Sequence, residues 1–247
     1  MTNTVDTFRA LHIPGDPLVL YNIWDAGSAR VVAEAGAKAI ATGSYGVAEA
    51  NGYRDGETLP LGVALENLRR ILTVTELPVT IDMEAGYGAT PAEVGVSVGK
   101  AFDLGAAGIN MEDRMPGATE LLPVADAAER VTAAAATGIH VNARTDVYLG
   151  VDPADYSRDL IDAVLQRASA YAEAGAGSLF VPFLGDHSTI NAICEASPLP
   201  VNVLWAPGRG SVAELAKLGV ARISYGHQPW SWAMEKLGAD ARAIHAG

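Results

Sequence analysis

The chain has 247 residues, 49% of them hydrophobic, which is enough for a sizeable buried core. Its formal net charge of −12 argues against nucleic acid or an anionic membrane as a partner. The single cysteine, Cys194, excludes an intrachain disulfide framework and suits a cytoplasmic location. The N-terminal segment has no apolar signal core, and no run is apolar enough to span a bilayer. Because no linker-like stretch divides the chain, we expect residues 1–247 to form one domain.

Short apolar runs alternate with segments of helical character along the whole chain. The predicted strands are, in order, residues 18–22, 39–42, 78–82, 108–112, 139–144, 178–182, 201–205 and 221–225. The predicted helices are residues 28–35, 61–73, 92–104, 124–136, 160–174, 189–196, 212–218 and 230–244. Strands that are almost continuously apolar are typical of a parallel sheet that is covered on both faces.

The helix ends carry further signals. Four helix-to-strand junctions contain a glycine suited to a left-handed C-cap, namely Gly36, Gly105, Gly175 and Gly219. Thr90 with Glu93, and Ser211 with Glu214, have the spacing of a capping box. Eight strand–helix units in about 250 residues predict a (β/α)8 barrel. The alternative, a doubly wound open sheet, would need a phosphate-binding glycine fingerprint after the first strand, and none is present.

Acidic residues follow the third and fourth predicted strands, at the end of a barrel where active sites lie. Asp82 and Glu84 are one residue apart, so strand alternation would place both on the same side, and Glu112 ends the next strand. Such acids are either solvated loop residues or ligands of a hard cation such as Mg²⁺ or Mn²⁺. Arg144, after the fifth strand, could grip a substrate carboxylate or pair structurally with Asp146 or Glu112.

Five motifs, in order and at strand ends, resemble the isocitrate lyase/phosphoenolpyruvate mutase superfamily over nearly the whole chain. They occupy residues 24–30 (WDAGSAR), 82–88 (DMEAGYG), 109–113 (INMED), 142–146 (NARTD) and 172–176 (AEAGA). The resemblance implies a barrel with a Mg²⁺-dependent site for a 2-oxo acid or its enolate. It also implies a homo-oligomer, a dimer or tetramer, and the resemblance leads us to expect exchange of the eighth helix between subunits.

The resemblance assigns metal ligands by position. Asp82 is similar to the direct ligand of Mg²⁺ (or Mn²⁺), and Glu84, Glu112 and Asp55 are similar to carboxylates that hold the metal largely through its waters. Metal and backbone donors at such a site would stabilise a developing enolate oxygen.

The resemblance also assigns the substrate contacts. Arg144 matches the arginine that grips the substrate carboxylate, and Arg144, Tyr45 and Glu112 are the candidate catalytic residues. The predicted turn at residues 43–46 (GSYG) matches a loop that holds the substrate's carboxylate and oxo group through backbone amides and a hydroxyl. The residues expected to bind substrate are Trp24, Gly43, Ser44, Tyr45, Gly46 and Arg144.

The chain departs from the lyases of this superfamily in one segment. After the fourth strand those lyases carry Lys-(Lys/Arg)-Cys-Gly-His, whereas residues 114–122 here read RMPGATELL. Cys194 falls in a predicted helix and does not replace the missing cysteine. Isocitrate or methylisocitrate cleavage is therefore not expected, and another acid–base must serve. The candidates are Tyr45, Tyr87, Glu120 and His227.

The leading expectation is a Mg²⁺-dependent C–C lyase or decarboxylase that acts on a 2-oxo acid or a substituted malate-type acid. The first alternative is a phosphoenolpyruvate phosphonomutase or phosphonopyruvate hydrolase, and the second is a protein that binds a 2-oxo acid without turnover. The second half of the substrate stays open. Residues 207–210 (PGRG) could bind a distal anion, but a turn before the Ser211 cap is favoured.

Overall fold

The computed structural model describes residues 4–246 and contains eight parallel strands in one sheet, in the order β1-β8-β7-β6-β5-β4-β3-β2. The strands are β1 (Leu18–Leu20), β2 (Ile40–Ala41), β3 (Val79–Asp82), β4 (Gly108–Glu112), β5 (His140–Arg144), β6 (Ser178–Val181), β7 (Val201–Leu204) and β8 (Arg222–Ser224). A parallel bridge joins Ile23 to Thr42, and the Ile23 amide donates to the Ala41 carbonyl at 2.8 Å, which links β1 to β2. The predicted (β/α)8 barrel is confirmed.

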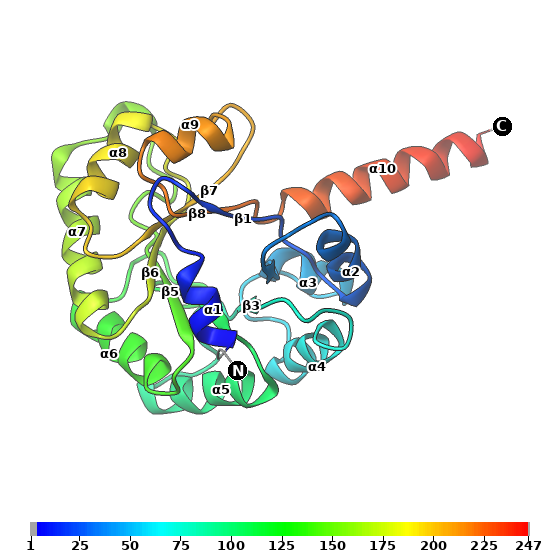
Figure 1. Cartoon of the computed structure of the whole chain (residues 1–247), viewed down its shortest axis with the longest axis horizontal. Helices are drawn as coiled ribbons and strands as arrows, with labels where there is room; N and C mark the ends of the chain where they lie inside the picture. The colour runs from blue at the N-terminus through cyan, green and yellow to red at the C-terminus, as the bar shows by residue number, and fades with distance from the viewer. Residues whose placement is uncertain (1–3, 247) are drawn as a thin grey trace.

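Helices follow the strands, and all of them except the last surround the barrel (Figure 1). They are α2 (Ala26–Glu34), α3 (Ser44–Ala50), α4 (Leu61–Ile71), α5 (Pro91–Leu104), α6 (Val124–Ala135), α7 (Arg158–Glu173), α8 (His187–Ala196), α9 (Val212–Lys217) and α10 (Gln228–His245). Every predicted helix and strand is present, with ends within two residues of the expected ones. Both capping boxes form, and the four junction glycines have positive φ angles of 84° to 111°.

Two short helices and a 3-10 turn, η1 (Pro153–Asp155), were not predicted. Helix α1 (Thr4–Ala10) covers the N-terminal end of the barrel, where Phe8 is fully buried. A Cβ added to Gly108 on β4 would approach Phe8 Cε1 to 2.6 Å, so this position has room only for glycine. Helix α3 replaces the turn that was expected at Gly43–Gly46: Gly43 is the N-cap, and Ser44 begins the helix.

The C-terminal helix differs from the others because it extends away from the barrel (Figure 1). Pro229 is its only buried residue, whereas Leu237 and Ile244 are 61% and 77% exposed. No helix among the described residues is long and apolar enough to cross a membrane.

Candidate active site

A cavity of about 140 Å³ opens at the carboxyl ends of the strands. All eight strands or the segments that follow them contribute to its lining, which consists of Asn22, Gly43, Ser44, Tyr45, Asp55, Asp82, Asn110, Arg144, Phe180, Pro182, Phe183, Leu204, Ser224, Gly226 and His227. A larger open groove, about 750 Å³, lies outside the barrel between α4, α5 and the β4–α6 loop. The smaller cavity has the composition and place of an active site, because it combines acids, one arginine and an apolar wall at the catalytic end of a barrel.

Asp82 lies at the end of β3 and is held by the backbone around it. Its Oδ2 accepts a hydrogen bond from the Ser44 amide at 3.3 Å, and its Oδ1 accepts one from the Glu84 amide at 3.2 Å. Burial raises the pKa of Asp82; the positive charge of Arg144 opposes this shift, and the negative charge of Asp55 adds to it. A cation next to Asp82 would therefore stabilise the ionised carboxylate.

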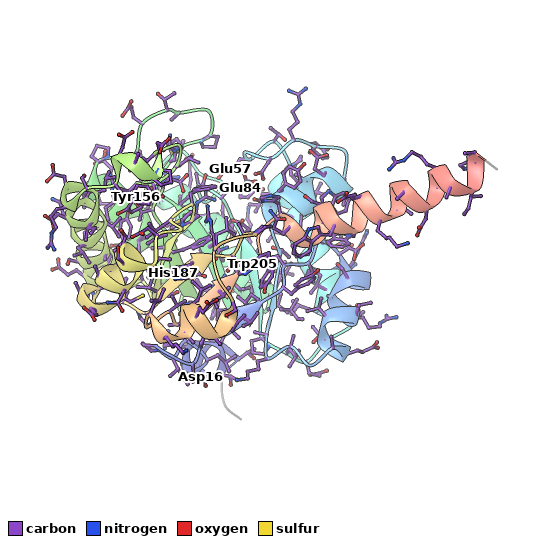
Figure 2. All side chains as sticks on the ribbon, turned by 90° about the horizontal axis from the view of Figure 1, so that it is seen from above. Asp16, Glu57, Glu84, Tyr156, His187 and Trp205 are labelled. Carbon is purple, nitrogen blue, oxygen red and sulfur yellow. The ribbon has the colours of Figure 1, made fainter. Side chains whose placement is uncertain are left out.

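The sequence suggested that strand alternation would turn Glu84 to the same side as Asp82. In the structure β3 already ends at Asp82, and Glu84 has a left-handed backbone with φ of 47°, so alternation does not apply to it. Its Oε2 accepts hydrogen bonds from the Gly56 amide at 2.8 Å and the Glu57 amide at 2.6 Å. Figure 2 shows Glu57 and Glu84 next to each other above the barrel. Glu84 thus anchors the loop that carries Asp55, and burial together with Asp82 raises its pKa to about 7.

Arg144 pairs with two acids and still lines the cavity. Its Nε and Nη2 donate to the two carboxylate oxygens of Asp146 at 2.6 and 2.9 Å, and its Nη1 lies 2.7 Å from Glu112 Oε2. The guanidinium centre is 5.7 Å from the ring of Phe183. Each terminal nitrogen of a guanidinium carries two N–H groups, so one on each remains for a ligand. Burial raises the pKa of Glu112 to about 8 even though Arg144 lowers it.

The four predicted metal carboxylates do not converge on one point. No group of three or more His, Cys, Asp or Glu side chains within residues 4–246 is arranged to hold an ion by itself. Asp82 and Asp55 face the cavity, Glu84 binds the loop, and Glu112 binds Arg144. One direct carboxylate with further acids nearby fits Mg²⁺, which keeps several of its waters, better than a closed zinc site.

The acid–base candidates divide by position. Tyr45 and His227 both line the cavity, and their rings meet edge to face with centroids 5.8 Å apart. Tyr87 instead donates to Glu84 Oε1 at 3.4 Å, and burial and the neighbouring acids raise its pKa. Glu120 is exposed and is not among the lining residues. Burial raises the pKa of Cys194 to about 12, as expected for a packing residue away from the site.

Two residues expected to bind substrate lie behind the cavity rather than on its surface. Trp24 packs edge to face on Trp230, with ring centroids 5.1 Å apart, and its carbonyl accepts from Asn67 Nδ2 at 2.9 Å. A Cβ on Gly46 would lie 3.2 Å from Trp230, so Gly46 lets α3 pack on this pair. Both residues support the start of α3, and neither belongs to the cavity lining.

Residues 207–210 form the turn that was favoured, since Gly208 and Gly210 have positive φ angles and Ser211 caps α9. Arg209 points to backbone carbonyls and not into the cavity: it donates to Phe183 O at 3.0 Å and Leu204 O at 3.2 Å. The guanidinium therefore ties the ends of β6 and β7 together and holds the wall of the cavity.

Sequence reasoning missed two parts of the lining. The floor contains Asn22, Asn110 and Ser224, and one wall contains Phe180, Pro182, Phe183 and Leu204. The floor residues do leave a signal, because an asparagine or serine within an otherwise apolar strand is an exception that a buried parallel strand tolerates only with partners. The wall leaves none, because apolar residues after a strand look the same in a core and in a cavity.

The chain is similar to known proteins over nearly its whole length. A family model described as phosphoenolpyruvate phosphomutase matches residues 8–245. An uncharacterised protein of Mycobacterium tuberculosis (strain ATCC 25618 / H37Rv) is 35% identical over 243 residues, 98% of this chain and 90% of the relative. An oxaloacetate decarboxylase of Pseudomonas aeruginosa (strain UCBPP-PA14) is 30% identical over 231 residues, 89% of this chain and 78% of the relative.

Solved structures share the fold. A crystal structure from Burkholderia cenocepacia J2315, provisionally described as a phosphonomutase, has a TM-score of 0.94 and 46% identity, with 99% of this chain and 98% of that chain covered. A phosphonopyruvate hydrolase in complex with oxalate and Mg²⁺ has a TM-score of 0.85 and 20% identity, with 100% and 89% covered, and is similar in fold alone.

Proposed function

Because the chain belongs to the phosphoenolpyruvate phosphomutase family, we propose that it is a Mg²⁺-dependent enzyme that breaks a C–C bond next to the 2-oxo group of a small carboxylic acid. The family's superfamily contains lyases, decarboxylases, mutases and hydrolases that act on pyruvate-like substrates. Loss of CO₂ from a diacid such as oxaloacetate would leave a pyruvate-like enolate. Retro-aldol cleavage of a malate-type acid would instead convert its C2 alkoxide to the 2-oxo acid and leave the enolate on the departing carboxylic acid.

One observation carries this proposal: Asp82, an acid that a cation would stabilise, and Arg144, a guanidinium with free N–H groups, line the same small cavity. A 2-oxo acid presents a carboxylate and an adjacent carbonyl oxygen, which are matched by an arginine and a metal ion. Mg²⁺, held by Asp82 with Asp55, Glu84 and Glu112 around it, would supply positive charge where the enolate oxygen develops.

The chain's own residues perform the remaining tasks. Arg144 orients the substrate carboxylate, and Asp146 and Glu112 fix Arg144. Phe183, whose ring centroid lies 5.7 Å from the guanidinium centre, would limit the access of water on that side. Tyr45, with His227 against its ring, is in position to deliver the proton that converts the enolate to a 2-oxo acid product.

Phosphorus chemistry is the second candidate, supported by the Burkholderia structure described as a phosphonomutase. A phosphonate dianion would need cationic partners beyond the carboxylate clamp. Arg144 is the only arginine or lysine among the described residues that line the cavity, and this favours C–C over C–P cleavage. Oxaloacetate is the first substrate to test, since a relative is an oxaloacetate decarboxylase.

The test is a panel of oxaloacetate, 2-alkylmalates and phosphonopyruvate, each with Mg²⁺ or with EDTA. Pyruvate or another 2-oxo acid is measured with a coupled dehydrogenase, and phosphate is measured separately. We expect metal-dependent release of a 2-oxo acid from a diacid, and its loss in Asp82→Asn. Phosphate from phosphonopyruvate, with no cleavage of the diacids, would favour the second candidate; binding of all three without turnover would favour a binding protein.

We also propose that the protein is a homo-oligomer in which α10 packs on a second copy of the chain. The helix projects from its own barrel (Figure 1). Leu237 and Ile244 on this helix are exposed. A groove of about 380 Å³ between β1 and α2, lined in part by Val19, Tyr21 and Val32, is an apolar surface of suitable kind.

A further inference from the structure

Arg222 is a buried cation that has no role in the proposed chemistry. It lies on β8 inside the barrel, has no exposed surface, and forms no ion pair with any carboxylate of residues 4–246. Its Nη1 has no hydrogen-bond partner among the described residues. Burial lowers its pKa to about 9, and the negative charge of Asp82 opposes the shift, so Arg222 stays charged at neutral pH. A buried charge without an ionic partner costs stability and calls for a functional explanation.

Arg222 holds two residues of the cavity floor. Its Nη2 donates to Asn110 Oδ1 at 3.0 Å, and its Nε donates to Ser224 Oγ at 3.3 Å. Asn142 Nδ2 donates to the same Asn110 oxygen at 2.9 Å. The polar contacts therefore cross the barrel from β8 to β4 and β5, directly below the cavity.

These contacts fix which way the Asn110 amide faces. A guanidinium can only donate, so the atom that meets Arg222 must be the amide oxygen. The Asn110 nitrogen then lies at the opposite end of a planar group whose oxygen is held by two donors. The Asn110 nitrogen has no hydrogen-bond partner among the described residues. It is also not one of the polar atoms of those residues that are both fully buried and without a partner. Asn110 lines the cavity beside Asp82, its neighbour in strand register, so the free N–H groups face the ligand space.

We propose that Asn110 is a substrate-binding residue whose Nδ2 donates to a carboxylate or oxo oxygen of the bound acid, and that Arg222 is the positioning residue that sets this orientation. Arg222 also places a fixed positive charge beneath an anionic ligand. The identity of the ligand class rests on the proposed function above, whereas the donor and its orientation rest on the contacts within the barrel.

The test measures binding rather than turnover. Oxalate, a planar dianion that mimics the pyruvate enolate, is titrated into the protein with Mg²⁺ by calorimetry. Loss of a hydrogen bond to a charged ligand corresponds to an increase in Kd of about tenfold or more, which we expect for Asn110→Ala. Arg222→Met removes the guanidinium and keeps much of its volume, and we expect a similar increase.

The double variant separates positioning from independent effects. The double variant combines Asn110→Ala with Arg222→Met. If Arg222 acts in part through Asn110, the oxalate Kd of the double variant rises by a smaller factor than the product of the two single-variant factors. Asn202→Ala is the matched control, because Asn202 is a buried asparagine on β7 that bonds Ser224 and does not touch Asn110. We expect it to lower the melting temperature while its oxalate Kd stays within about twofold of the wild-type value.

Three outcomes have distinct meanings. An unchanged Kd in Asn110→Ala, with oxalate binding intact in the wild type, overturns the inference and leaves the proposed function standing. Failure of the wild type to bind oxalate with Mg²⁺ contradicts the proposed function itself. If Asn110→Ala does not fold, Asn110→Ser is titrated in its place, and an unchanged Kd there has the same overturning force.

Discussion

At the scale of single residues, the orientation of the Arg144 guanidinium depends on the two acids that pair with it. Two parallel hydrogen bonds to Asp146, which is 1% exposed, fix the plane of the guanidinium, and Glu112 fixes its end. A lysine carries the same charge on one nitrogen and cannot make this pair of bonds. The orientation of the carboxylate clamp is therefore a property of three residues and not of the arginine alone.

We expect Arg144→Lys to lower activity on the order of 100-fold, because the clamp loses its orientation, and to reduce the free energy of unfolding by about 1–3 kcal/mol. Activity is followed by pyruvate release and stability by urea titration. Arg114→Lys is the control, since Arg114 lies 3.6 Å from the same Asp146 and does not line the cavity. Full activity in Arg144→Lys would contradict the role of the guanidinium.

The raised pKa values of the acids make a prediction about pH. The pKa of Glu112 is about 8 and that of Glu84 is about 7, both above the ordinary value of 4.5. A carboxyl whose pKa is higher in the folded than in the unfolded state contributes stability that is complete at low pH and is lost as pH rises through the folded pKa. Without metal, we therefore expect the melting temperature to fall between about pH 5 and about pH 8.

Mg²⁺ should reverse much of this loss, because a cation stabilises the ionised acids. The increase in melting temperature on adding Mg²⁺ to EDTA-treated protein is expected to be larger at pH 8.5 than at pH 6, and smaller in Asp82→Asn at both. A metal effect that is equal at the two pH values would show that these carboxylates do not respond to the ion.

At the scale of elements, helix α1 and strand β4 depend on each other. Phe8 fills the space that a side chain at position 108 would need, and its ring also packs on His140 at 5.3 Å between centroids. We expect Phe8→Ala to reduce the free energy of unfolding by about 3–5 kcal/mol. Gly108→Ala should cost about 1–3 kcal/mol in the wild type through overpacking.

The cost of Gly108→Ala should shrink in the Phe8→Ala background, because the added methyl group then occupies the vacated space. Urea unfolding of the four proteins measures this coupling. Additive losses would mean that α1 does not seal the barrel where β4 begins, contrary to the contact between Phe8 and Gly108.

The regular elements could be predicted from the sequence because their signals are local: apolar runs for strands, capping boxes and junction glycines for helix ends. Helix α1 could not, since two buried residues, Val5 and Phe8, are too few to show a period. Four residues without this local logic, Glu57, Glu84, Tyr87 and Phe183, have left-handed backbones. Phe183 lines the cavity, and the other three are joined to one another by hydrogen bonds beside it. Tertiary contacts impose the conformation of these residues. Strand alternation therefore did not predict the orientation of the Glu84 side chain.

The candidate site divides in the same way. Asp82, Arg144, Ser44 and Tyr45 reach the cavity as their place after the strands indicated. Asp55, which only the family resemblance assigned, lines the cavity from the loop between α3 and α4. Glu84 and Glu112 are engaged with a backbone loop and with Arg144, and only the folded structure reveals these partners. The Asn110–Arg222 contact joins residues 112 positions apart, a distance at which a single sequence has no pairing signal.

At the scale of the whole molecule, α10 is the element whose environment is least complete in a single chain. We expect wild-type protein to sediment as a dimer or larger assembly, because Leu237 and Ile244 would otherwise expose their apolar side chains. Replacing both with glutamate should shift sedimentation toward the monomer, and replacing the exposed Lys217 with glutamate on α9 serves as a charge control. A wild-type monomer at micromolar concentration would contradict this arrangement.

We propose that the cavity forms a pyruvate-like enolate with the help of Mg²⁺ and Asp82. The most direct test is proton NMR of pyruvate in D₂O with the protein and Mg²⁺, beside an EDTA sample and Asp82→Asn. We expect the methyl signal to decay as deuterium enters, and to persist in both controls. A methyl signal that persists with the wild type and Mg²⁺, under conditions where oxalate binds, would contradict the claim.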